Sequence, residues 1–103
     1  MKIDFDKVNE LIKNSITTIP GLAGLTDLNT KEYKILKNDV SSAINCEENE
    51  WELSFKIGVA LSEWCIIKEL VQEIQIRIYY EFEKHKIIDR PFKINVYVTD
   101  LII

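Results

Sequence analysis

The chain has 103 residues, of which 47% are apolar and 29% are charged, and its formal net charge is −4. This length accommodates one domain and excludes a catalytic domain joined to a separate regulatory domain. The acidic balance argues against nucleic acid as the main partner, because proteins that follow a phosphate backbone carry a basic excess. We therefore expect a single globular domain spanning residues 1–103.

Cysteine and histidine, the residues of redox motifs and of most transition-metal sites, are few in this sequence. Cys46 and Cys65 are too far apart for a Cys-x-x-Cys motif, and His85 is the single histidine. The N-terminus lacks the apolar run of a signal peptide, and no stretch approaches the roughly 18 apolar residues of a membrane span. We expect a cytoplasmic protein with reduced thiols and without a membrane span, a metal or a cofactor.

The first predicted element is an amphipathic helix from Phe5 to about Thr18. Asp4 or Asp6 can cap its start, and Pro20 limits its end because proline disfavours helical geometry in the residue before it. The apolar residues recur at spacings of three and four, at Phe5, Val8, Leu11, Ile12, Ile16 and Ile19.

The next two segments are a predicted turn and a region with an ambiguous pattern. Residues 20–26 contain two glycines and are expected to form a turn that buries Leu22 and Leu25. In residues 27–46, Tyr33 and Ile35 alternate with charges as in a strand, although one helical turn also fits. We expect a strand somewhere between 33 and 46.

The acidic run from Glu47 to Glu50 is expected to be a turn, and the clearest strand pattern follows it. Gly58 is expected to end or bulge this strand, because glycine weakens strand pairing. The strand should have one buried face, since apolar side chains alternate with polar or small ones at Trp51, Leu53, Phe55, Ile57, Val59 and Leu61.

A long helix is predicted from Ser62 to about His85. Ser62 can act as the N-cap, and Leu61 and Ile66 occupy the two positions of a hydrophobic staple. Lys84 and its neighbours suit the negative end of the helix dipole. The predicted core stripe of this helix consists of Trp64, Ile67, Leu70, Val71, Ile74, Ile78 and Phe82.

The last predicted strand runs from Phe92 to Thr99, where apolar and polar residues alternate again. The apolar end, Leu101 to Ile103, could close the sheet edge or meet a partner. The order helix-strand-strand-helix-strand predicts an α+β fold with a three-stranded mixed sheet and two helices on one face. The long helix should return the chain so that the last strand runs parallel to the Trp51 strand.

No group of residues suggests a catalytic site. His85 lies in a charged run at a helix end, where the helix dipole explains its position. The acids Glu47, Glu48 and Glu50 match no calcium loop, and a solvated turn accounts for them. We therefore expect no enzyme, with no catalytic, metal-binding or cofactor-binding residues.

Two features are candidates for interaction. Cys65, Ile76 and Tyr80 lie opposite the core stripe of the long helix, where a surface helix should be polar, so they indicate either self-association or scattered surface apolarity. Gly21-Leu22-Ala-Gly24 fits the G-x-x-G pattern of KH-like RNA-binding domains, although it lacks basic residues. The alternative function is therefore nucleic-acid binding at this turn.

The segment Ile19-Pro-Gly-Leu-Ala-Gly-Leu25, after an amphipathic helix, resembles the signature of the alkaline-shock, Gls-type envelope-stress proteins of low-GC Gram-positive bacteria and mollicutes. Gly58-Val-Ala-Leu-Ser-Glu63 is similar to the strand-to-helix junction of that family, and the Val71-Gln72 helix and the closing strand follow in the same order. Ser62 stands where the family usually has proline, residues 26–46 diverge, and the charged tails of longer members are absent. The chain resembles a minimal, core-only member.

This resemblance implies a non-enzymatic cytoplasmic homo-oligomer, or a protein that docks on membrane-anchored envelope proteins at the cytoplasmic face of the membrane. Small family members are also linked with fatty-acid and phospholipid metabolism, which implies a fatty-acid-metabolism enzyme as another class of partner. The resemblance further implies that Ser41 to Cys46 forms the first strand. Together with the missing catalytic arrangement, it leads to the hypothesis of an interaction module whose contacts come from the outer side of the long helix and from the Pro20 to Leu25 turn, which contains Gly21, Leu22 and Gly24.

Overall fold

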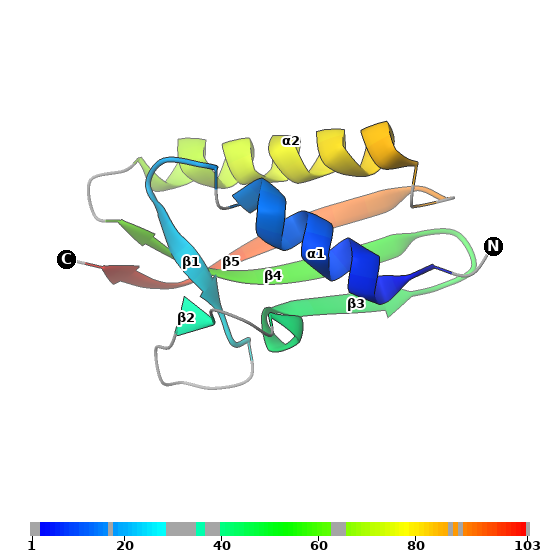
Figure 1. Cartoon of the computed structure of the whole chain (residues 1–103), viewed down its shortest axis with the longest axis horizontal. Coiled ribbons are helices and arrows are strands. Elements are labelled where there is room, and N and C mark those ends of the chain that lie inside the picture. The colour runs from blue at the N-terminus through cyan, green and yellow to red at the C-terminus, as the bar shows by residue number, and fades with distance from the viewer. Residues whose placement is uncertain are drawn as a thin grey trace.

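The computed structural model arranges the chain in the order α1, β1, β2, a short 3₁₀ turn, β3, β4, α2 and β5, with both helices on one face of the sheet (Figure 1). The structure describes residues 3–16, 18–28, 35–36, 40–62, 66–86, 88 and 90–102. The predicted α+β class and the mixed sheet are confirmed. Within these described residues the sheet has five strands rather than the expected three.

The central strand is β4 (Leu53–Ser62). Along one edge it pairs in parallel with β5 (Phe92–Ile102), as the expected crossover requires. Two antiparallel strands share its other edge: β3 (Ile44–Glu48) pairs with residues 53–57, and β1 (Leu22–Thr26) pairs with residues 59–61. The short β2 (Ile35–Leu36) extends the sheet beyond β1.

The core lies between the sheet and the two helices. The inward side chains of β4 are fully buried, and the Phe55 ring meets the Phe82 ring of α2 edge to face at a centroid distance of 5.4 Å. Phe82 also packs against Phe92 of β5 at 5.3 Å. From α1 and α2 the core receives Val8, Ile12, Ile16, Leu70, Ile74, Ile78 and Phe82.

The first helix, α1 (Phe5–Ile16), ends slightly before the predicted Thr18. The expected cap is confirmed for Asp4, whose Oδ1 accepts a hydrogen bond from the Lys7 amide at 3.2 Å. Thr18 lies in the turn after α1, and its hydroxyl donates to the Ser15 carbonyl at 2.9 Å.

The prediction that residues 20–26 form a turn is wrong, because residues 22–26 form β1. Only the entry is a turn: Gly21 has a φ of 88°, and its carbonyl accepts a hydrogen bond from the Ser62 amide at 2.8 Å. The edge of β4 beyond β3 has unpaired backbone groups, and pairing with β1 satisfies them. As expected, Leu25 is buried, while Leu22 is partly buried against the core.

The strand expected between 33 and 46 is divided between β2 and β3. The implied first strand at Ser41 to Cys46 is wrong in its first half, because Ser41–Ala43 form the 3₁₀ turn. The turn expected at Glu47 to Glu50 is also displaced, since the first two of these acids belong to β3.

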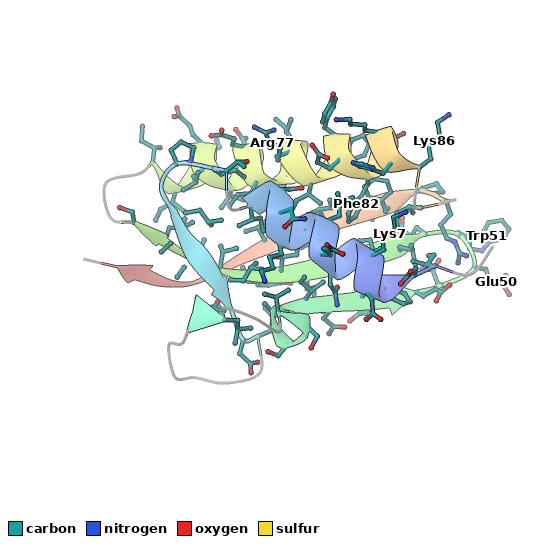
Figure 2. The ribbon with its side chains drawn as sticks, in the orientation of Figure 1. Lys7, Glu50, Trp51, Arg77, Phe82 and Lys86 are labelled. Atoms are coloured by element: carbon teal, nitrogen blue, oxygen red, sulfur yellow. The ribbon has the colours of Figure 1, made fainter. Side chains whose placement is uncertain are left out.

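Asn49 sets this displaced turn. Its Oδ1 accepts hydrogen bonds from the amides of Trp51 and Glu52, at 2.8 Å and 2.7 Å. Side-chain acceptors of this kind stabilise turns, so β4 starts only at Leu53. Trp51 therefore lies at the hairpin tip beside Glu50 and is 79% exposed, against the prediction that it begins the buried face (Figure 2).

Gly58 neither ends β4 nor bulges it. A Cβ at this position would lie 2.5 Å from the carbonyl oxygen of Thr26 in β1, so the glycine permits a close approach of the two strands. The irregularities lie in the neighbouring strands instead. The register shifts opposite Ala60, between Leu22 and Gly24 in β1 and between Val98 and Asp100 in β5.

The second helix, α2 (Ile67–His85), begins five residues later than predicted. Ser62 is the last residue of β4, because β5 still pairs with it, so the predicted N-cap is wrong. The staple is wrong as well, since Ile66 is 65% exposed. Ile67 is exposed rather than buried, and Trp64 lies outside the described residues. Val71 is only half-buried, and the remaining members of the predicted stripe are confirmed as buried: Leu70, Ile74, Ile78 and Phe82.

The last strand, β5, extends beyond the predicted Thr99 to Ile102. Leu101 pairs with Leu61 and Ile102 with Ser62, so the apolar end continues the sheet. Within the described part of the chain, neither helix has the length and apolar character needed to cross a membrane.

Candidate interaction surface on the second helix

Exposed large apolar side chains concentrate on α2 and at its start. Ile76 is 70% exposed, whereas Ile78 is fully buried two residues later. Two residues turn a helix by about 200°, so Ile76 points almost directly away from the core. In Figure 2, side chains rise from α2 on the side away from the sheet, while Phe82 lies between α2 and the sheet. Other exposed apolar residues of this region are Ile66, Ile67, Tyr79 and Tyr80.

A shallow groove of about 410 Å³ follows this outer side of α2, and it is lined by Gln75, Ile76, Tyr79, Tyr80 and Glu83. Tyr79 and Tyr80 are each about half exposed. Tyrosine offers a large apolar ring with a polar tip, a combination that is common at protein interfaces. We define these five residues as the α2 groove.

Contacts hold the walls of the α2 groove in place. The Tyr79 ring packs against Phe92 at a centroid distance of 4.9 Å. A hydrogen bond to the Glu83 carboxylate raises the pKa of Tyr79 above its usual value. The ammonium group of Lys84 lies 6.0 Å from the centroid of the Tyr80 ring. The groove therefore presents ordered rings, which lowers the entropy lost on binding.

Gln75 ties the groove to the edge of the sheet. Its Nε2 donates to the Ile94 carbonyl at 2.8 Å. The Leu53 amide bonds to the Pro91 carbonyl, and carbonyl directions alternate along a strand, so the Ile94 carbonyl points away from β4. Among the described strands, β5 pairs only with β4, so Gln75 covers one acceptor on the other edge of β5, where unpaired groups invite pairing with other chains.

The predicted interaction residues do not form one surface. Ile76 and Tyr80 lie together in the α2 groove, whereas Gly24 pairs with Ala60 inside the sheet. The neighbouring pair, Leu25 and Val59, is buried in the core, so Gly24 lies on the opposite face of the sheet, which the helices do not cover.

The other two predicted interaction residues of the first turn, Gly21 and Leu22, have structural roles. Gly21 turns the chain into β1, and Leu22 packs against the core. A G-x-x-G clamp requires a loop between two helices, but here the second glycine belongs to a strand. The segment therefore lacks the geometry of a KH-like nucleic-acid clamp. Cys65 lies outside the described residues.

The sequence analysis missed Tyr79 as a member of the surface. Tyr79 follows Ile76 by three residues, and residues three or four apart are neighbours on a helix. This spacing could have revealed it. Tyr79 lies between the outer side of α2 and the sheet, where one side of its ring contacts Phe92.

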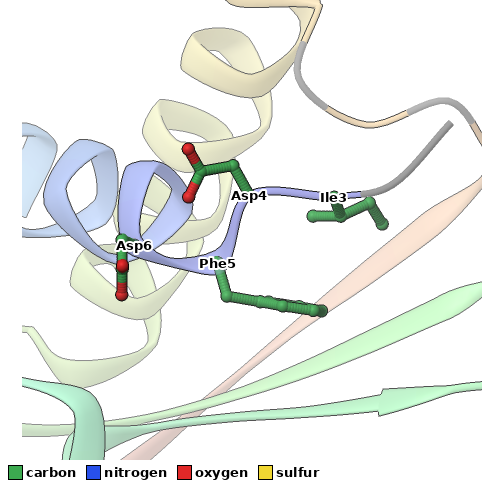
Figure 3. A pocket seen from close by; sticks show the side chains of 4 residues that line it. All are labelled: Ile3, Asp4, Phe5 and Asp6. Atoms are coloured by element: carbon green, nitrogen blue, oxygen red, sulfur yellow. The ribbon is translucent and has the colours of Figure 1, made fainter.

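Two other hollows lie near α1. One, of about 340 Å³, is lined by Ile3, Asp4, Phe5 and Asp6, with the Phe5 ring directed toward the sheet (Figure 3). Asp4 is the helix cap there, so its carboxylate has a structural role. The other, of about 280 Å³, lies between α1 and β3 and includes Cys46 and Phe55.

Cys46 has an unreactive setting. Burial raises the pKa of its thiol above the usual value, and the Glu48 carboxylate adds to the rise, while Arg90 opposes it. Reactive cysteines have lowered pKa values. His85 lies at the exposed end of α2, 3.4 Å from a Glu81 carboxylate oxygen. In the described ranges, no three His, Cys, Asp or Glu side chains come close enough to hold a metal ion.

Comparisons with known proteins show a fold likeness alone. No protein-family model matches the chain, and no curated protein matches it. The solved structure named MamM-CTD 215-293 has a TM-score of 0.51 and 9% identity, and the match covers 92% of this chain and 99% of that one. MamM CTD M250L has a TM-score of 0.50 and 9% identity, with 91% and 96% covered. Sequence identities this low show that the chain shares the α+β fold of these domains, and they show nothing about its role.

Proposed function

We propose that this protein is a non-enzymatic interaction module that acts through the α2 groove. The observation that carries the proposal is the exposure of Ile76, Tyr79 and Tyr80 on the side of α2 that faces away from the core. An exposed cluster of apolar and aromatic side chains with a polar border is typical of a protein-binding surface.

The same proposal assigns the protein to the alkaline-shock, Gls-type group, as a scaffold in envelope stress response or envelope-lipid homeostasis. Its support is the resemblance of Ile19 to Leu25 and of Gly58 to Glu63 to the motifs of that group. The partners would be a second copy of the chain, a membrane-anchored envelope protein or a fatty-acid-metabolism enzyme, met at the cytoplasmic face of the membrane.

A site-specific photo-crosslinker tests the binding role in cells of the source organism. Replacing Ile76 with benzoylphenylalanine should give crosslinked products that mass spectrometry identifies as one of these partners. The matched control is the same amino acid at Tyr97, which is exposed on the open face of the sheet. Equal crosslinking at both positions, or none at Ile76, would contradict the proposal.

A genetic experiment tests the cellular role. Cells that lack the protein should show altered phospholipid composition or sensitivity to envelope stress, and the wild-type chain should restore both. The Ile76→Glu variant should accumulate to the wild-type level and fail to restore them. Full complementation by this variant would show that the α2 groove is not the working surface.

A further inference from the structure

The outer side of α2 carries an ordered pattern of charge beside its apolar residues. Ile76 and Tyr80 lie one turn apart and form the centre of a strip. Glu69 and Glu73 lie toward the N-terminal end of this strip, and Lys84 lies toward its C-terminal end. Each of these three charged residues is exposed.

The positions along the helix axis are nearly symmetric. Relative to the midpoint between Ile76 and Tyr80, Glu73 lies about 7.5 Å toward the N-terminus and Lys84 about 9 Å toward the C-terminus, at 1.5 Å per residue. At about 100° per residue, Glu73 and Lys84 also fall on the same flank of the strip. The Lys84 ammonium group lies over the Tyr80 ring, which keeps it at the strip.

Resting on the proposed function, we propose that the occupant of this surface is a second copy of the chain, with the two α2 helices antiparallel about a two-fold axis. In that arrangement Ile76 of each copy meets Tyr80 of the other, and Glu73 of each copy meets Lys84 of the other. A two-fold interface needs such self-complementarity, because each pairwise contact occurs twice.

The charges also select the direction of the pair. In a parallel pair, Glu73 of one copy and Lys84 of the other would lie about 16 Å apart along the helices and on opposite flanks of the strip, so these contacts would not form. The antiparallel pair brings Glu73 of each copy to Lys84 of the other on the same flank, so it forms both attractive contacts. Direction is therefore fixed by residues that flank the apolar centre, as charged flanking positions do in coiled coils.

The size of the surface indicates a weak dimer. The 19 residues of α2 form a helix about 28 Å long and about 10 Å wide. Two such faces bury less than the roughly 1,200 Å² of a stable interface, so the dimer should be transient, with a dissociation constant at the micromolar level or weaker. A weak self-contact leaves the groove available for exchange with another partner.

Sedimentation velocity of the full chain over a range of concentrations measures this association. The wild type should pass from monomer to dimer as its concentration rises. Glu73→Lys and Lys84→Glu should each raise the dissociation constant about tenfold, because each turns two attractions into two repulsions. Circular dichroism checks that both variants fold, and Glu10→Lys, on the exposed side of α1, is the charge-matched control.

Mixing the two variants gives the sharpest result. In a dimer of one Glu73→Lys chain and one Lys84→Glu chain, lysine faces glutamate at both contacts, so the mixture should dimerise about as well as the wild type. The inference is overturned by a wild type that stays monomeric throughout, by reversals that change nothing, or by a mixture that stays monomeric. If the chain stays monomeric but benzoylphenylalanine at position 76 still crosslinks to another protein, the dimer is refuted and the proposed function is retained.

Discussion

The carbonyl oxygen of Thr26 lies so close to Gly58 that a Cβ at position 58 would be 2.5 Å from it. The two residues belong to β1 and β4, and their approach brings the buried Thr26 hydroxyl into a hydrogen bond with Thr99 of β5. The Thr99 hydroxyl in turn donates to the Val59 carbonyl at 3.2 Å. These threonines connect the strands on both sides of β4 across the glycine.

Gly58→Ala should therefore destabilise the protein. The added methyl group meets a backbone atom, so β1 must move and the threonine contact is disturbed. We expect the free energy of unfolding to fall by about 2–3 kcal/mol, as for overpacked cores. Urea denaturation measures it, with Ser54→Ala on the same strand as the control. A loss below about 0.5 kcal/mol would show that β1 adjusts freely.

Trp51→Ala should leave stability nearly unchanged, although this residue continues the apolar alternation of β4. Its side chain is 79% exposed at the hairpin tip, so we expect a change within about 0.5 kcal/mol. Leu53→Ala removes a fully buried side chain and should cost about 2–5 kcal/mol. Thermal and urea unfolding measure the loss in the free energy of unfolding for each of the two variants. Similar losses would mean that Trp51 packs against the core.

Gln75→Ala should expose the edge of β5. The variant loses the hydrogen bond to the Ile94 carbonyl, which we expect to lower the free energy of unfolding by about 1 kcal/mol. It should also aggregate faster, because an acceptor on a free strand edge becomes available. Light scattering during incubation at moderate temperature measures this. Gln72→Ala, which is exposed on α2, is the control and should behave as the wild type.

Cys46 should react slowly with thiol reagents. Burial and the Glu48 carboxylate raise its pKa, so the pH midpoint of alkylation should be higher in the folded protein than in urea. The measurement uses a Cys65→Ser background so that one thiol is followed. A lower midpoint in the folded protein would contradict the burial of this thiol.

The same shift has a consequence for stability. As pH rises, the unfolded chain loses the Cys46 proton first, because the folded pKa is the higher one. The contribution of this group to stability is therefore complete below the unfolded pKa and is lost as pH rises through the folded pKa. Comparing the stability of Cys46→Ser and Cys46 proteins across alkaline pH isolates it, and a difference that grows in the opposite direction would refute the assignment.

Gly21→Asp should destabilise the chain without revealing an RNA-binding role. Gly21 has a φ of 88°, where any side chain is strained, so we expect a loss of about 1 kcal/mol or more. Filter binding at low salt should retain no RNA with either the wild type or the variant. Salt-sensitive retention by the wild type that disappears in the variant would restore the nucleic-acid alternative.

Much of the candidate surface was predictable from spacing. Ile76 and Tyr80 stand opposite a core stripe that the structure confirms at Leu70, Ile74, Ile78 and Phe82. The prediction that Gly21, Leu22 and Gly24 belong to the same interaction surface as Ile76 and Tyr80 is wrong. These residues belong to a segment whose role depends on pairing with the end of β4, and no local pattern reveals that pairing.

The sequence by itself determined the two helices, the strands at β4 and β5 and the parallel crossover between them, because the 3.6-residue and two-residue periods are properties of the local chain. The tertiary structure alone decided that residues 22–26 join the sheet, that β4 continues to Ser62 and that α2 starts at Ile67. Those outcomes depend on which distant backbone groups are left to pair along the edge of β4. Hydrogen bonds between strands stabilise contacts between distant parts of the chain. The free energy that they contribute outweighs the local preferences of these residues for turns and helix caps.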